Sequence, residues 1–162
     1  MLGVILSETK NLEINKKEQK MSKIAIVYWS GTGNTEMMAK EVAAGVQAAG
    51  GDASVFATSD FSADAATVFD KFALGCPAMG AEELEDSEFQ PLYEQLKPAL
   101  SGKKVVLFGS YGWGGGEYMT AWKNDAVSAG LILVDDPLAI ENAPDDDGKS
   151  KCQELGRVLA LA

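Results

Sequence analysis

Three hydroxyl side chains, those of Ser30, Thr32 and Thr35, lie in a short turn that also contains Gly31 and Gly33. The turn follows a continuous apolar run and opens a segment with helical spacing. Its backbone N–H groups are therefore expected at the unpaired, electropositive start of a helix, where anions bind. The glycines allow the backbone to close around such an anion. Because the turn contains no lysine or arginine, its neutral donors suit one terminal monophosphate better than a triphosphate with magnesium.

Three other interpretations of this turn compete with a monophosphate site. The turn lacks the Gly-Lys-Ser/Thr ending of a nucleoside triphosphate loop. Glu36 stands where a dinucleotide fingerprint would place its third glycine. A plain strand-to-helix turn, with Asn34 or Thr35 as the N-cap, would need no ligand at all. Taken alone, the turn leaves the ligand site and the plain turn equally open.

Alternating strands and helices surround the turn. Apolar runs predict strands over residues 23–29, 53–58, 72–76, 103–109 and 131–134. Periodic apolar residues predict helices from the turn to Gly50, over 63–67, over 89–100, from 118 to Gly130 and over 150–160. This alternation predicts a single three-layer, doubly wound α/β domain with a five-stranded parallel sheet.

Three unusual loops follow the first, third and fourth predicted strands. They are the hydroxyl-rich turn at 30–35, an acidic loop at 77–87 and a glycine-rich aromatic loop at 110–116. Ligands of such sheets bind beyond the carboxyl ends of the strands, at the point where the strand order reverses. We therefore expect the loops to converge at one edge, which favours a ligand site over a plain turn.

Composition narrows the possible functions. The formal net charge of −10 disfavours nucleic acid and anionic membranes and favours basic protein patches as partners. The chain has no histidine, and Cys76 and Cys152 lack metal-ligand spacing, so we expect no metal site. The same cysteines indicate reduced thiols in a cytoplasmic protein. No apolar run approaches the length of a membrane span.

Residues 1–20 do not share this pattern. They contain one short apolar run and a polar stretch without periodicity, whereas Met21 leads directly into the first predicted strand. We expect residues 1–20 to be a non-native or disordered extension, and residues 21–162 to form the domain. If mass spectrometry of the intact native protein gave the mass of all 162 residues, this hypothesis would be contradicted.

Three motifs, in order and at matching spacing, resemble those of the short-chain flavodoxins. They are Tyr28-Trp29-Ser30-Gly31-Thr32-Gly33-Asn34-Thr35, Gly75-Cys76-Pro77-Ala78-Met79-Gly80 and Gly109-Ser110-Tyr111-Gly112-Trp113-Gly114. The resemblance covers residues 22–162. It implies a sheet of order 2-1-3-4-5, bound flavin mononucleotide (FMN) and low-potential one-electron transfer between larger redox enzymes by a monomeric carrier. It implies no catalytic residue for substrate turnover.

The resemblance also assigns roles within an FMN site. Trp113 would stack on one face of the isoalloxazine ring and Met79 would cover the other. The Gly80 carbonyl would accept a hydrogen bond from flavin N5–H and stabilise the neutral semiquinone, and Glu82 would contact flavin N3–H. Asn142 would lie near the dimethylbenzene side or the ribityl chain. The complete set of implied FMN-binding residues is Ser30, Gly31, Thr32, Gly33, Asn34, Thr35, Pro77, Ala78, Met79, Gly80, Ala81, Glu82, Ser110, Tyr111, Gly112, Trp113, Gly114 and Asn142.

The acidic loop beside this site has two interpretations. A solvated charge run is typical of most such sequences. Alternatively, the carboxylates of Glu82, Glu83, Glu85 and Asp86 would lower the second reduction potential and steer basic partners toward the flavin. Ferredoxin or flavodoxin reductases, a pyruvate oxidoreductase, a hydrogenase and a nitrogenase reductase would all suit an acidic carrier.

Two other functions are compatible with the fold. An FMN-dependent quinone reductase is the main alternative, although the chain has neither histidine nor a long insertion to build a substrate pocket. A phosphorylated receiver domain would need clustered aspartates at the end of the first strand, where Trp29 and Ser30 stand instead.

Overall fold

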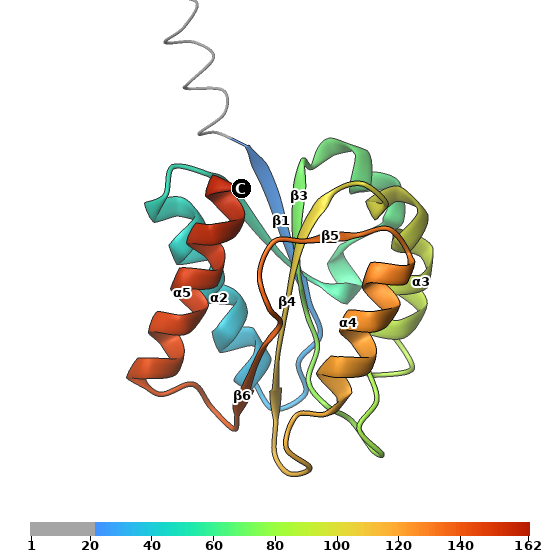
Figure 1. Cartoon of the computed structure of the whole chain (residues 1–162), viewed down its shortest axis with the longest axis vertical. Coiled ribbons are helices and arrows are strands. Elements are labelled where there is room, and N and C mark those ends of the chain that lie inside the picture. The colour runs from blue at the N-terminus through green and yellow to red at the C-terminus, as the bar shows by residue number, and fades with distance from the viewer. Residues whose placement is uncertain (1–21) are drawn as a thin grey trace, which may run out of the picture.

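A computed structural model describes residues 22–162, and the extension expected over residues 1–20 lies outside that range. The described residues form one parallel sheet of order β2-β1-β3-β4-β5, as predicted (Figure 1). Its strands are β1 (Lys23–Tyr28), β2 (Asp52–Ala57), β3 (Lys71–Gly75), β4 (Lys104–Tyr111), β5 (Ile132–Leu133) and β6 (Leu138–Glu141). The order reverses between β1 and β3, so a cofactor is expected at the carboxyl end of these two strands.

Helices cover both faces of the sheet. Helices α2 (Asn34–Ala48) and α5 (Asp146–Leu161) lie on one face, and α3 (Phe89–Leu100) and α4 (Tyr118–Ser128) lie on the other (Figure 1). In β1, Ile24 and Ile26 pack toward α2 and α5, whereas Ala25 and Val27 pack in the core under α3 and α4. All four side chains are fully buried, which explains why the strand is apolar from Ile24 to Val27. No helix between residues 22 and 162 has both the length and the apolar character needed to cross a bilayer.

The fifth strand position is divided, which the sequence did not predict. β5 pairs with the start of β4 through Ile132 and Leu133, and β6 pairs with the end of β4 from Phe108 to Tyr111. Pro137 immediately precedes β6 and has no N–H to donate to a ladder. After the break between β5 and β6, the chain pairs with the carboxyl end of β4. Asn142, which directly follows β6, therefore lies at the carboxyl edge of the sheet.

Two helices differ from their predicted form. The segment predicted as a helix over 63–67 is the 3₁₀ helix η2 (Ala63–Val68), which follows another short one, η1 (Thr58–Asp60). Helix α5 begins four residues before the predicted position, because the Asp145 carboxylate accepts a hydrogen bond from the Gly148 N–H at 2.7 Å and caps it. Gly148 lies inside the first turn of α5.

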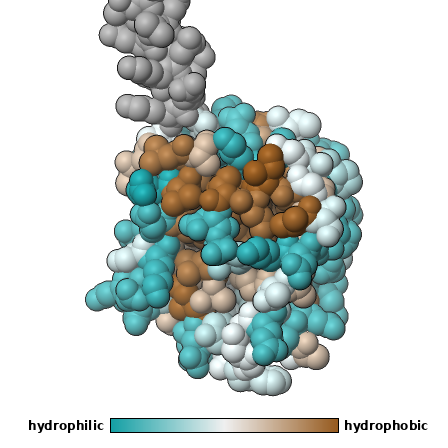
Figure 2. All heavy atoms as spheres, in the orientation of Figure 1, coloured by the Kyte–Doolittle hydropathy of each residue, from teal (hydrophilic) through white to brown (hydrophobic). Residues whose placement is uncertain are grey.

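Apolar side chains gather in the upper half of the face on which β5 lies, and hydrophilic residues surround them (Figure 2). β5 is the outermost strand on this path, and Ile132 within it is 47% exposed. With only two residues, β5 presents a short edge, which limits pairing with another chain.

Candidate cofactor site

The three unusual loops leave the sheet at the same edge, as the sequence predicted. Tyr28, Gly75 and Phe108 are adjacent across β1, β3 and β4, so the loops that follow start side by side. Between them lies a cavity of about 280 Å³. It is lined by Trp29, Ser30, Gly31, Thr32, Asn34, Thr35, Pro77, Ala78, Met79, Ser110, Tyr111, Gly112 and Asn142. Six residues of the predicted site do not line this cavity: Gly33, Gly80, Ala81, Glu82, Trp113 and Gly114.

The turn at the start of α2 is organised by the hydroxyl of Ser30. Its Oγ accepts hydrogen bonds from the N–H groups of Gly33 at 3.1 Å and Glu36 at 3.3 Å. Gly33 is the N-cap and has a left-handed φ of 97°, which glycine adopts without strain. The plain-turn expectation that Asn34 or Thr35 caps the helix is therefore wrong.

Four N–H groups of this turn have no protein acceptor among residues 22–162: those of Gly31, Thr32, Asn34 and Thr35. They lie at the positive end of the α2 dipole, where an anion would satisfy them. The Thr35 hydroxyl shares a buried hydrogen bond of 3.0 Å with the Ser110 hydroxyl. This bond joins the turn to the end of β4, so two of the three loops form one wall.

The loop after β3 forms a tight hairpin. Met79 and Glu83 exchange two backbone hydrogen bonds of 2.8 and 2.9 Å, and residues 80–82 form the tip. Gly80 and Glu82 have left-handed φ values of 50° and 60°. A Cβ at Gly80 would meet no atom within 4 Å. Glycine is therefore favoured at this position by the backbone conformation and not by lack of space.

The carboxylate of Glu82 is the clearest sign of a missing ligand. Both of its oxygens are buried and have no hydrogen-bond partner among the described residues. The carboxylate lies against Gly114 in the next loop, so closely that a Cβ there would collide with it. A buried carboxylate without a partner is strongly destabilising, so this group fits a ligand that donates a hydrogen bond.

Two large exposed apolar side chains lie in the loops after β3 and β4. Met79, which is 38% exposed, lines the cavity, whereas Trp113, which is 76% exposed, does not. Trp29, which was not in the predicted set, lines the cavity and also the neighbouring hollow around Gly80. Trp29 was predicted as the last residue of the first strand and belongs to the first of the three motifs, but no role at the site was predicted for it.

Glu85 does not belong with the exposed carboxylates of the acidic loop, which corrects the expectation that it steers partners. It is 4% exposed, and its carboxylate accepts hydrogen bonds from the Ser87 hydroxyl and from the N–H groups of Ser87, Glu88 and Phe89 at the start of α3. Burial raises its pKa, but these hydrogen bonds outweigh burial and leave the pKa below its ordinary value. The Glu85 side chain therefore caps the N-terminus of α3.

Cys76 has a structural place beside this cap. Its Sγ accepts a hydrogen bond from the Glu85 N–H at 3.3 Å. Burial raises the pKa of the Cys76 thiol to about 12, so it is protonated and unreactive at neutral pH.

These features define the class of protein. A doubly wound sheet whose carboxyl edge carries unpaired helix-start N–H groups, clustered hydroxyls and an unpaired buried carboxylate is a mononucleotide-binding α/β protein.

Comparison with known proteins identifies the family. The flavodoxin family model matches residues 26–156. The flavodoxin of Megasphaera elsdenii is 49% identical over 139 residues, which cover 86% of this chain and 99% of the relative. That of Clostridium beijerinckii is 45% identical over 135 residues, covering 83% and 97%. The solution structure of two-electron reduced M. elsdenii flavodoxin has a TM-score of 0.78 at 50% identity and covers 86% of this chain and 99% of that one. The chain belongs to the flavodoxin family.

Membership establishes the general function. The protein is an electron carrier that uses FMN, and its redox partners are other redox proteins. The quinone reductase considered above is not favoured by these relatives.

Proposed function

We propose that the three loops hold FMN with its phosphate at the 30–35 turn and its ring between Met79 and Trp113, and that the protein turns over no substrate of its own. Bound FMN supplies one-electron redox chemistry. The observation that carries this proposal is the set of four N–H groups without acceptors at the start of α2. They match a dianionic phosphate without any basic side chain.

Some residues of the turn would donate hydrogen bonds to the phosphate, and others hold the turn in place. The N–H groups of Gly31, Thr32, Asn34 and Thr35 would donate to phosphate oxygens, and the Thr32 and Thr35 hydroxyls would add two further donors. Ser30 already orders the turn by accepting two N–H groups. Gly33, with its left-handed φ of 97°, would direct these donors toward the phosphate.

The ring would be held by the hairpin and the two loops that face it. Glu82 would accept a hydrogen bond from flavin N3–H, which gives its unpaired carboxylate a partner. The Gly80 carbonyl would accept from flavin N5–H when that atom is protonated. Pro77, Ala78 and Ala81 would complete the hairpin wall.

The β4 and β6 ends would complete the cradle. Ser110, Tyr111 and Gly112 would border the ring, and Gly114 would leave room for the Glu82 carboxylate. Asn142 would lie near the dimethylbenzene side or the ribityl chain. Its left-handed φ of 60° and the hydrogen bond from its N–H to the Tyr111 carbonyl at 2.8 Å support a fixed position at this edge.

The proposed partners are larger redox enzymes with basic docking surfaces. Ferredoxin or flavodoxin reductases, a pyruvate oxidoreductase, a hydrogenase and a nitrogenase reductase are the candidate classes, because a net charge of −10 attracts basic surfaces. We further propose a monomer acting in the cytoplasm, since both cysteines are free and buried.

The test is FMN titration followed by stepwise anaerobic reduction with visible spectroscopy. We expect one FMN per chain and reduction in two separate one-electron steps. Direct two-electron reduction by NADH alone would favour the quinone reductase instead. Failure to take up FMN would contradict the assignment of the three loops.

A further inference from the structure

Trp29 lies between two hollows of the molecule. The cofactor cavity is on one side, and a second hollow of about 410 Å³ surrounds Gly80 on the other. Trp29 and Met79 are the residues that the two linings share. Every lining residue of the second hollow except Trp29 belongs to the loop at 79–87. Trp29 is therefore the one wall of this hollow that the loop does not supply itself.

The indole of Trp29 also reaches the turn at 30–35. A Cβ at Gly31 would lie 3.0 Å from the Cη2 atom of the indole and 3.3 Å from its Cζ3 atom. The Trp29 N–H donates to the Gly75 carbonyl at 3.0 Å, and its side chain packs against the core under α3 and α4. Because both the backbone and the core hold Trp29, the indole is a fixed spacer beside the turn.

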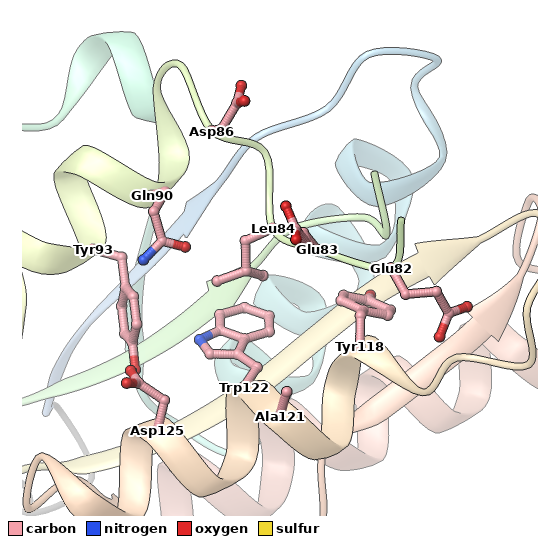
Figure 3. A pocket seen from close by; sticks show the side chains of 10 residues that line it. All are labelled: Glu82, Glu83, Leu84, Asp86, Gln90, Tyr93, Tyr118, Ala121, Trp122 and Asp125. Atoms are coloured by element: carbon pink, nitrogen blue, oxygen red, sulfur yellow. The ribbon is translucent and has the colours of Figure 1, made fainter. Parts of the chain in front are cut away.

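The hairpin at 79–83, which we refer to as the ring hairpin, is anchored on its far side. Leu84 directly follows it and packs against the core, and Figure 3 shows the Leu84 side chain pointing toward the Trp122 indole. The next residue, Glu85, is fixed as the cap of α3. Gly80 at the tip of the hairpin is exposed and lies in open space. The position of the tip therefore depends on the support that it receives from the cofactor side.

We propose that Trp29 is a positioning residue, which sets the distance between the turn at 30–35 and the ring hairpin. Closely packed side chains transmit a displacement instead of absorbing it. A shift of the turn would therefore move the indole, and the indole would move Met79 and the Gly80 peptide. The inference rests on the proposed function, because the Gly80 carbonyl is the group assigned there to flavin N5–H. Through this contact the phosphate end of the site would influence the two reduction potentials.

The test is a double-mutant cycle of Gly31→Ala and Trp29→Phe in the FMN-loaded, full-length protein. Gly31 has no left-handed φ, and the indole is what an added Cβ would meet. The new methyl group should displace the indole by a few tenths of an ångström. Phenylalanine lacks the Cη2 and Cζ3 atoms, so in the Trp29→Phe background the same methyl group has no indole to displace. The cycle thereby subtracts any direct effect of Gly31→Ala on phosphate binding.

Gly31→Ala should shift the amide NMR signals of residues 79–83 when Trp29 is present. The separation between the two reduction potentials should change by about 30 mV, which is about threefold because 59 mV corresponds to tenfold for one electron. In the Trp29→Phe background both effects should fall to less than about half. Gly51→Ala is the matched control, since a Cβ there would meet the Val46 side chain at 2.7 Å, next to the start of β2. It should leave the hairpin signals and both potentials unchanged.

Trp29→Phe alone gives a second measurement, which does not depend on Gly31→Ala binding FMN. Met79 and Glu83 join the hairpin through two backbone hydrogen bonds. With the support shortened, hydrogen exchange of these two amides should become about fivefold faster. The Gly102 N–H, which donates to the Gly130 carbonyl at 2.8 Å in the turn between α3 and β4, should exchange at its original rate.

Three results would overturn the proposal. They are equal effects of Gly31→Ala in the two backgrounds, unchanged exchange of the hairpin amides in Trp29→Phe, and an equal shift of the hairpin signals by Gly51→Ala. FMN loading is measured separately by absorbance. A protein that takes up one FMN but shows an additive cycle would refute the role of Trp29 and leave the proposed function intact. Failure to take up FMN would refute the proposed function itself.

Discussion

The hydroxyl of Tyr118 donates a hydrogen bond of 2.9 Å to the main-chain carbonyl of Cys76, and both groups are buried. Cys76 directly follows β3 and precedes the ring hairpin, and Tyr118 begins α4 just after the loop of Trp113. The bond passes over Gly109, where a Cβ would collide with both partners. A single side chain therefore ties together the two loops that we assign to opposite faces of the flavin ring.

We predict that Tyr118→Phe weakens FMN binding. The variant leaves the Cys76 carbonyl without its donor, at a cost of about 1–2 kcal/mol, and lets the two loops separate. The FMN dissociation constant, measured by quenching of flavin fluorescence, should rise about tenfold. Tyr93→Phe is the matched control, because it removes a hydroxyl that bonds Asp125 outside the cofactor cavity. Equal effects of the two variants on FMN affinity would show that the bond has no role in positioning the loops.

We predict that Gly80→Ala changes the two reduction potentials more than it changes the affinity for oxidised FMN. A left-handed φ of 50° is strained for alanine by about 1 kcal/mol, although the space around the site is open. The proposed bond from flavin N5–H requires this backbone to present its carbonyl only after reduction. The separation between the potentials should shift by about 50 mV, since 59 mV corresponds to a tenfold change for one electron.

Gly102→Ala provides the control for this prediction. Gly102 also has a left-handed φ, 82°, with no atom within 4 Å of a Cβ, but it lies in the turn between α3 and β4. Its replacement should lower stability by a similar amount and leave both potentials unchanged. If potentiometry gave the same potentials for Gly80→Ala as for the parent protein, the hydrogen-bonding role of Gly80 would be refuted.

The hydrogen bonds of the Glu85 carboxylate should make the stability of the protein depend on pH. Its pKa is lowered from 4.5 in the folded protein, so its contribution is fully present above its unfolded pKa and is lost as the pH falls through the folded value. Glu85→Gln should therefore reduce the free energy of unfolding by about 1–2 kcal/mol at pH 7 and by much less once the pH lies below the folded pKa, as measured by urea denaturation across the acid range. Glu83→Gln, which removes an exposed carboxylate, should change stability by less than about 0.5 kcal/mol at either pH. A loss in Glu85→Gln that did not vary with pH would contradict the role of its charge.

Much of the fold was predictable because burial has a direct sequence signature. The continuous apolar run of β1 reflects a strand covered on both faces, and the spacing of Phe89, Tyr93, Leu96 and Leu100 in α3 matches their burial. The division of the fifth strand was not predictable in this way. The residues of β6 are only partly buried, and Pro137 in front of them reads as a loop residue.

The site was predictable where its residues form a local motif and less so where they act through the fold. The turn at 30–35 was recognisable from its glycines and hydroxyl side chains. The role of Glu85 was not recognisable, because a carboxylate within a run of acidic residues is expected to be solvated. Its hydrogen bonds come from N–H groups at the start of α3, which only the fold places beside it. Trp29 likewise gains its place in the cavity from the neighbouring strands.

The phosphate turn gives the sharpest prediction, because the ligand can be varied as well as the protein. Ser30→Ala removes the acceptor of two backbone N–H groups and should disorder the donors that surround the phosphate. FMN binding should weaken about tenfold, whereas binding of riboflavin, which lacks the phosphate, should hardly change. Ser62→Ala is the matched control, since Ser62 also accepts a backbone N–H, from Asp64 at 3.3 Å, at the start of η2. An equal loss of affinity for FMN and riboflavin in Ser30→Ala would place the phosphate elsewhere.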